Sequence, residues 1–320
     1  MKKPLLTALV LVLVVSFTAC GSLPEEELTP PSSVSTTTPT AQATKEPSNA
    51  AEAPVNAEQQ EPISESDEPQ ETEEISIEEV VLVDEADIKI TAKSFDADAL
   101  FGPEVKLLIE NNSSKDLTFQ CRNSSVNGYM VDTMMSVDVV SGKKANDALT
   151  FMSSDLDACR IDVIADMEFS FHIYTSEDWE TYLDTQLFTI HTTAAEGFEY
   201  VFDDSGDVAY DENGVKIVIK GLSEDDSIFG PGVIVYIENN SDDNVTVQAR
   251  DVSINGFMID PLFSSDIVAK KHAVDAITFM SSDLEDNAIT QIESIELAFH
   301  IFETESWDTI ADSDTLSITF

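Results

Sequence analysis

The second half of the chain repeats the first, and this internal repeat limits how the chain can fold. Phe101-Gly102-Pro103 recurs as Phe229-Gly230-Pro231 at an offset of 128 residues, and the offset holds without a gap as far as Ile190. About 42 of these 90 aligned positions are identical. The repeating unit of about 115 residues is the size of a domain rather than one turn of a solenoid. The sequence therefore predicts two copies of one domain, at 80–193 and 207–320, with a linker at 194–206.

Within each copy the sequence pattern is that of short strands. Apolar and polar residues alternate over 117–122 and again over 245–250, which is typical of half-buried strands. Asn127-Gly128 and Asn255-Gly256 predict tight hairpin turns, because both residue types tolerate positive φ. About seven or eight such strands per copy indicate an all-β fold of two tandem immunoglobulin-like β-sandwiches. Two short helical turns, which begin near Ser154 and Ser282, resemble capping boxes.

The N-terminal segment predicts export. Lys2 and Lys3 precede an apolar stretch from Leu5 to Val15, which is shorter than the about 20 residues of a membrane-spanning helix and typical of a signal peptide. The small residues before Cys20 resemble the bacterial lipobox, in which the cysteine thiol is diacylated and becomes the first residue. We expect residues 1–19 to be removed and Cys20 to anchor the chain on the extracellular side of the cell membrane. An ordinary secretory signal followed by a chance cysteine is the alternative.

The segment 20–79 has the composition of a tether. Residues 32–40 are almost all Ser, Thr and Pro, and residues 52–79 are rich in Glu, Pro, Gln and Ser. Such a composition buries too little apolar area to offset chain entropy, so we expect a disordered, acidic linker after the lipidated cysteine.

The charge balance restricts the partners. With 62 acidic and 16 basic residues, the formal net charge is −46. Nucleic acid is excluded as an expected partner because it requires clustered Lys and Arg. Such a charge attracts cations or basic peptides, although a solvated acidic surface is the simpler interpretation.

Longer strings shared by the two copies resemble known proteins. A strand that ends in Glu110-Asn111-Asn112-Ser113, followed by a polar turn and an alternating strand, is similar to telokin-like immunoglobulin folds of Gram-positive lipoproteins. The strings at 127–130 and 150–156 resemble uncharacterised clostridial surface proteins. The resemblance covers both copies and implies a fold and an extracellular address. It implies no activity and no binding residues.

Only two cysteines follow Cys20. Cys121 and Cys159 both lie in the first copy, and the second copy has Ala249 and Asn287 at the matching positions. Because both are absent together from the second copy, they are candidates for a structural disulfide in an exported domain. Two unrelated thiols are the alternative.

Two arginines occupy equivalent positions and suit carboxylate pairing. Arg122 and Arg250 are expected to form a structural clamp with a retained aspartate, either at 132 and 260 or at 138 and 266. If a ligand site exists instead, the first choice is the face of the strand that carries the arginine in each copy. These faces are formed by Gln120 with Arg122 and by Gln248 with Arg250.

The sequence leaves more than one role open for the histidines and tryptophans that occur at equivalent positions of both copies. His172 and His300 are expected to be hydrogen-bonded structural residues, since no nucleophile motif accompanies them. Trp179 and Trp307 either cover one end of each sandwich or form exposed sugar-stacking platforms. The acidic cluster over 203–207 is the nearest approach to a calcium loop, with a solvated loop as the alternative.

The pattern favours a binding or adhesion pair over an enzyme. Residues shared by both copies offer no catalytic set, and we expect no catalytic residue, cofactor or metal site. The expected partners are the membrane, through the lipid, and an unknown extracellular protein or envelope ligand. A structural spacer or envelope sensor is the second hypothesis, and an envelope hydrolase is the third.

Overall fold

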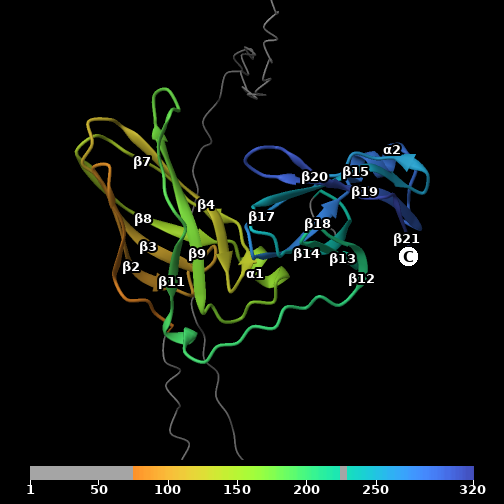
Figure 1. Cartoon of the computed structure of the whole chain (residues 1–320), viewed down its shortest axis with the longest axis horizontal. Helices are drawn as coiled ribbons and strands as arrows, with labels where there is room; N and C mark the ends of the chain where they lie inside the picture. The colour runs from red at the N-terminus through yellow and green to blue at the C-terminus, as the bar shows by residue number, and fades with distance from the viewer. Residues whose placement is uncertain (1–74, 224–228) are drawn as a thin grey trace, which may run out of the picture. The chain divides into compact units, whose positions relative to one another are not determined.

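The computed structural model describes residues 75–223 and 229–320, and these form an all-β protein of several sheets (Figure 1). The predictions for the signal peptide, for Cys20 and for the tether up to residue 74 lie outside the described residues. Within the described ranges, no helix is long and apolar enough to cross a membrane. We call residues 80–193 repeat 1 and residues 207–320 repeat 2.

Repeat 1 consists of strands with one short α-helix and one 3-10 helix. Its elements are β1 (Val80–Glu85), β2 (Ile88–Asp96), β3 (Glu104–Asn111), β4 (Leu117–Val126), β5 (Tyr129–Met130), β6 (Thr133–Met134), β7 (Ser136–Val139), β8 (Lys143–Phe151), α1 (Ser153–Ala158), β9 (Asp166–Thr175), β10 (Thr181–Asp184), β11 (Phe188–His191) and η1 (Thr193–Ala195).

Repeat 2 has nearly the same succession of elements. They are β12 (Asp207–Glu212), β13 (Val215–Leu222), β14 (Gly232–Asn239), β15 (Val245–Ile254), β16 (Phe257–Met258), β17 (Ser264–Ile267), β18 (His272–Thr278), α2 (Ser281–Asp286), β19 (Ser294–Glu303), β20 (Thr309–Asp312) and β21 (Leu316–Thr319).

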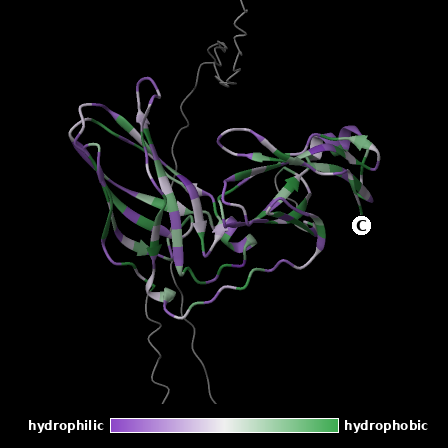
Figure 2. Ribbon diagram, viewed as in Figure 1, coloured by the Kyte–Doolittle hydropathy of each residue, from purple (hydrophilic) through white to green (hydrophobic). Residues whose placement is uncertain are grey.

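Each repeat buries its apolar residues between two layers of strands. In repeat 1 the order β1-β2-β3-β8-β6 forms one layer, and β10-β9-β4-β5 forms the other. Side chains from both layers meet in one core, with Ile90 and Leu107 from the first and Phe119 and Phe169 from the second. Figure 2 shows green and purple residues alternating along these strands, as expected when one face is buried and the other is exposed. The alternation predicted from the sequence is therefore present.

The Asn-Gly turns are two-residue hairpins. β4 ends at Val126 and β5 begins at Tyr129, and φ is 48° at Asn127 and 86° at Gly128. The equivalent turn in repeat 2 has φ of 50° and 84° at Asn255 and Gly256. Positive φ at both central residues is the requirement of the tightest hairpin turn, so the prediction is confirmed.

The asparagine side chain of the first turn also holds a distant loop. Asn127 Nδ2 donates to the carbonyl of Val163 at 2.7 Å, and its Oδ1 accepts from the amide of Ala165 at 2.9 Å. Asn255 makes the equivalent bonds in repeat 2, donating to Gln291 and accepting from Glu293. The turn residue therefore fixes the position of the loop that precedes β9 or β19.

A fully buried asparagine ends β3 and its counterpart β14. Asn111 Nδ2 donates to the carbonyls of Lys115 (2.8 Å) and Val139 (2.7 Å), and Oδ1 accepts from the amide of Ser113 (3.0 Å). In repeat 2, Asn239 makes the equivalent bonds to Asp243, Ile267 and Ser241. One side chain thus replaces the backbone partners that the chain loses where it leaves the sheet. This network gives the first Asn and the Ser of Glu-Asn-Asn-Ser the same structural role in both repeats.

The two repeats are not separate sandwiches on a linker, because one sheet contains strands of both. β5 of repeat 1 pairs in parallel with β18 of repeat 2, where Tyr129 faces His272. The His272 amide donates to the carbonyl of Gly128 at 3.0 Å, and Lys271 forms an ion pair with Glu168 at 2.8 Å. The ring of Phe202, from the segment between the repeats, stacks on His272 with centroids 3.6 Å apart.

The expected capping boxes are absent. The capping positions are Met152 and Met280, and neither has a side chain that caps the helix. The helices begin at Ser153 and Ser281, earlier than the motif predicts, so Ser154 and Ser282 lie inside the first turn. Asp155 Oδ2 accepts from the amide of Asp132 at 2.8 Å and so joins α1 to the segment after β5.

Replacing Asn111 by Ala should destabilise the protein by about 3 kcal/mol, because buried carbonyls and an amide lose their partners. Urea denaturation followed by circular dichroism measures the change. Asn112→Ala is the matched control, since Asn112 is exposed and the bond from its backbone amide to Asp87 is retained. Equal losses in the two variants would contradict this role for Asn111.

Candidate functional site

A stack of aromatic rings ends in an exposed tryptophan in repeat 1. The Trp179 ring lies nearly parallel to that of Tyr174, with centroids 5.6 Å apart and an interplanar angle of 15°. Tyr174 is buried and packs in turn against His172 at 5.3 Å. The side chain of Trp179 is nevertheless 75% exposed. One face of the indole therefore has a buried support, and most of the side chain contacts solvent.

Repeat 2 contains the same stack. Trp307 lies on Phe302 at 5.5 Å and 15°, and Phe302 packs against His300 at 5.2 Å. Trp307 is 73% exposed. We call Trp179 and Trp307, each with its supporting ring, the tryptophan platforms. Of the two alternatives from the sequence, burial over the end of each sandwich is wrong.

The backbone explains why these tryptophans project into solvent. Trp179 and Trp307 lie in the turns after β9 and β19 with φ of 63° and 64°. A left-handed conformation is a steric outlier for a bulky residue and is found where the surroundings enforce it. Here the amide of Trp179 donates to the Thr175 carbonyl at 2.9 Å, and Trp307 does the same to Glu303 at 2.9 Å. Both repeats therefore keep a strained turn that presents an indole ring.

The histidines at the base of each stack are structural, as expected. His172 Nδ1 is hydrogen-bonded to Asp184, and His300 Nδ1 lies 2.6 Å from Asp312. Within residues 75–223 and 229–320, no hydroxyl or thiol is hydrogen-bonded to either imidazole. The His–Asp pairs orient the imidazole rings in the two stacks.

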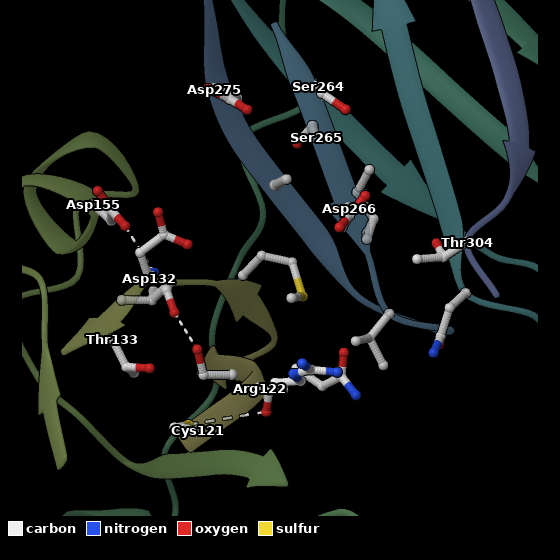
Figure 3. Close-up of a pocket in the computed structure, with 18 of the residues that line it drawn as sticks. Cys121, Arg122, Asp132, Thr133, Asp155, Ser264, Ser265, Asp266, Asp275 and Thr304 are labelled. Atoms are coloured by element: carbon white, nitrogen blue, oxygen red, sulfur yellow. Dashed lines mark hydrogen bonds between the residues drawn. The ribbon is translucent and has the colours of Figure 1, made fainter. Parts of the chain in front are cut away.

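A second feature is a cleft of about 730 Å³ lined by residues of both repeats (Figure 3). Asp132 and Asp155 come from repeat 1, and Asp266 and Asp275 come from repeat 2. In Figure 3 these carboxylates lie on opposing walls, with Arg122 and Cys121 on the repeat 1 side. All four acids have an aspartate at the matching position of the other repeat. The sequence did not identify this cleft. An aspartate at the same position of both repeats does not show which aspartates lie close together in the folded chain.

The cleft raises the proton affinity of two of its acids. Burial raises the pKa of Asp275, and the nearby charges of Asp132 and Asp155 raise it further. Burial likewise raises the pKa of Asp132, with contributions from Asp155 and Asp266. Among the described residues no group of acids, histidines or cysteines has an arrangement that could hold a metal ion.

The expected arginine clamp is not formed. Asp138 accepts a hydrogen bond from Thr118 at 2.6 Å, and Asp266 accepts one from Thr246 at 2.6 Å. In the described part of the chain, neither Arg122 nor Arg250 is in an ion pair. Threonine hydroxyls therefore bind the carboxylates of one of the two aspartate pairs that the clamp could have used.

The residues of the expected ligand faces lie on β4 and β15, one Gln and one Arg in each repeat. Arg122 lines the cleft, whereas Gln120, Gln248 and Arg250 do not. Gln248 donates to the hydroxyl of Ser264 at 3.3 Å. A bulge after Arg122 and Arg250 breaks the strand register, and the following residues, Asn123 and Asp251, have positive φ. A ligand role for these two pairs stays a prediction.

Both cysteines are free thiols in the structure, so the expected disulfide is not formed there. Burial raises the pKa of Cys121 to about 11, partly offset by a hydrogen bond from Thr133. Burial raises the pKa of Cys159 to about 12. Both thiols therefore stay protonated at neutral pH, and a protonated thiol is a poor nucleophile.

The acidic cluster over 203–207 faces lysines. Lys216 pairs with Asp204 at 2.6 Å, and Lys220 pairs with Asp203 at 3.1 Å. Lys220 also donates to the carbonyl of Ser205 at 2.7 Å. The lysines of β13 thus pair with two carboxylates of this cluster.

Comparisons with known proteins add no identification. No family model matches the chain, and no curated protein matches it.

Asp275→Asn should stabilise the protein at pH 7. A raised pKa means that the folded state holds the proton more tightly than the unfolded state, in which Asp titrates near about 3.9. The contribution of Asp275 to the free energy of unfolding is therefore fully present below the unfolded pKa. It is lost as the pH rises through the pKa of the folded state. Asn does not ionise, so the variant keeps this stability as the pH rises. Its amide oxygen can still accept a hydrogen bond from the Ala276 amide.

Melting temperatures measured from about pH 4 to pH 7 check this prediction. The advantage of the variant should shrink toward pH 4. Asp84→Asn, on exposed β1, controls for the change in net charge. A variant that is less stable than the parent at pH 7, or an advantage no larger than that of the control, would refute the prediction.

Proposed function

We propose that the chain is an exported bacterial lipoprotein, anchored through Cys20, whose two β-sandwich repeats form a non-catalytic pair of binding modules. The address is supported by the N-terminal sequence and by the resemblance to immunoglobulin-like lipoprotein domains. The binding role is supported by one structural observation, which is that both repeats present a tryptophan platform. A spacer without a ligand would not need to keep this feature twice.

The platforms have the properties of a binding site. Single exposed apolar residues are common on protein surfaces, so exposure alone carries no argument. Here the exposure coincides with a strained backbone and with a supporting ring, in two independent copies. A rigid aromatic ring costs little conformational entropy on binding, and tryptophan is enriched among residues that dominate binding energy.

The charge around the platforms favours a cationic ligand. Glu177 and Glu180 are exposed beside Trp179, and Glu305 and Asp308 are exposed beside Trp307. An ammonium or guanidinium group over an indole face is attracted by the ring and here also by these carboxylates. We therefore propose a basic segment of a partner protein as the ligand, with its Lys or Arg side chains placed on the platforms.

Two weak sites on one chain become useful together. A cation on an exposed aromatic ring contributes only about 0.5–1 kcal/mol. A ligand that engages both platforms gains from effective concentration, because the second contact is intramolecular. Duplication of the domain is therefore consistent with binding through several weak contacts.

Replacing either tryptophan by Ala should weaken binding of a lysine- and arginine-rich peptide by roughly two- to fivefold, and replacing both should weaken it further. Isothermal titration calorimetry measures the affinity. Because Trp→Ala leaves the net charge unchanged, adsorption to the acidic surface alone would leave the affinity unchanged, and that result would refute the proposal.

Two further comparisons make the test specific. Trp179→Phe should retain part of the affinity, since a phenyl ring still attracts cations. A neutral chito-oligosaccharide is the competing ligand. If it binds and the basic peptide does not, the platforms are sugar-stacking surfaces instead.

A further inference from the structure

The same hairpin is covered in one repeat and open in the other. Tyr129, in β5 of repeat 1, is 2% exposed. Its counterpart Phe257, in β16 of repeat 2, is 47% exposed, and the next residue, Met258, is 68% exposed. The sequences Asn-Gly-Tyr-Met and Asn-Gly-Phe-Met and the backbone of the turns are nearly the same. The difference therefore comes from what lies against each hairpin.

The cover of the first hairpin is the edge of β18 together with the rings of Tyr200 and Phe202 from the segment between the repeats. β5 lies between β4 and β18, whereas β16 has β15 as its only neighbour among the described strands. Met130 packs against the core of repeat 2, and Tyr236 and Val218 pack into the core of repeat 1. A hairpin of this sequence thus has an established partner, which is the strand at the position of β18.

A second copy of the chain offers an equivalent edge. β8 occupies in repeat 1 the position that β18 occupies in repeat 2. Its pairing outside β3 involves only Phe151 and Thr150, so in the described structure the outer edge from Lys143 to Leu149 has no strand partner. This edge is exposed at Lys143, Lys144 and Asn146.

The ion pair of the internal contact can be repeated between copies. Lys271 and Glu168 pair at 2.8 Å with side chains that are 13% and 20% exposed. Their counterparts, Lys143 and Glu296, are both present and both exposed. The Gly128 carbonyl, which accepts from β18, has its counterpart in Gly256.

We infer that the hairpin at Phe257 and Met258 docks on the β8 edge of a second copy of this chain, so that molecules associate head to tail. The contact repeats between chains the one that joins the two repeats within a chain. It uses a different surface on each partner, so it generates rings or open chains rather than a two-fold dimer.

The contact between copies is weaker than the internal one. His272 and Tyr236 are replaced by Lys144 and Leu108, so the edge of β8 lacks the two aromatic rings that β18 and β14 place against the first hairpin. Lysines on an exposed edge also oppose indiscriminate strand pairing. Association is therefore expected only at high concentration or where anchoring crowds the molecules.

Analytical ultracentrifugation over a wide concentration range tests the inference. The chain from residue 20 onward, with Cys20→Ser to exclude lipid, retains every residue that the structure describes. Its average mass should rise with concentration toward multiples of the monomer. Phe257→Asp with Met258→Asp should weaken this association by about tenfold or more. Both residues are exposed, so circular dichroism should report an unchanged fold.

A charge exchange identifies the partner edge. Lys143→Glu and Glu296→Lys should each weaken association, and the double variant should restore it, because the opposite charges again face each other between copies. Val208→Asp is the control, since Val208 is 58% exposed on β12 and lies outside the hairpin.

Several results would overturn the inference. A monomer at every concentration would do so. So would an association that the hairpin variant leaves unchanged, or one that Val208→Asp removes equally. Failure of the double charge variant to restore association would exclude the β8 edge as the partner. None of these results depends on whether the tryptophan platforms bind a ligand.

Discussion

The buried asparagine at the end of β3 and β14 is the interaction on which each sandwich depends. Where a strand leaves a sheet inside the protein, backbone carbonyl and amide groups lose their partners in the sheet. Water cannot reach these groups, so leaving them without a hydrogen bond would reduce the stability of the fold. Asn111 and Asn239 each satisfy several such groups with one amide, at full burial. The next turn can then be short, and the following strand, β4 or β15, crosses to the other layer.

The contact between the two repeats decides which of their surfaces remain available. The β5–β18 pair gives the two repeats one continuous sheet and covers one Asn-Gly hairpin, while the other stays open. The cleft lined by both repeats holds five carboxylates, those of Asp132, Asp155, Asp266, Asp275 and Glu305. This concentration of like charge opposes the packing that the aromatic rings around His272 favour. The association of the repeats is therefore a balance between apolar contact and charge repulsion.

The tryptophan platforms differ from the rest of the molecule in that neither burial nor turn preference accounts for them. Glycine would fit the left-handed turn position better, yet both repeats place an indole there. The ring stack beneath each indole stabilises the conformation without hiding it. A feature that is locally unfavourable and present in both copies is more consistent with binding than with folding.

The sequence by itself determined the duplication, the all-β class and the hairpins at Asn127 and Asn255. These depend on the repeat of the residues, on their period along the strands and on the φ values that Asn and Gly tolerate. Only the tertiary structure decided that Trp179 is exposed, that Cys121 and Cys159 are apart as free thiols, that threonines rather than arginines bind Asp138 and Asp266, and that one hairpin is covered. In each of these cases the outcome depends on which distant segment lies against the residue. Local pattern cannot encode that, because the same motif is buried in one repeat and exposed in the other.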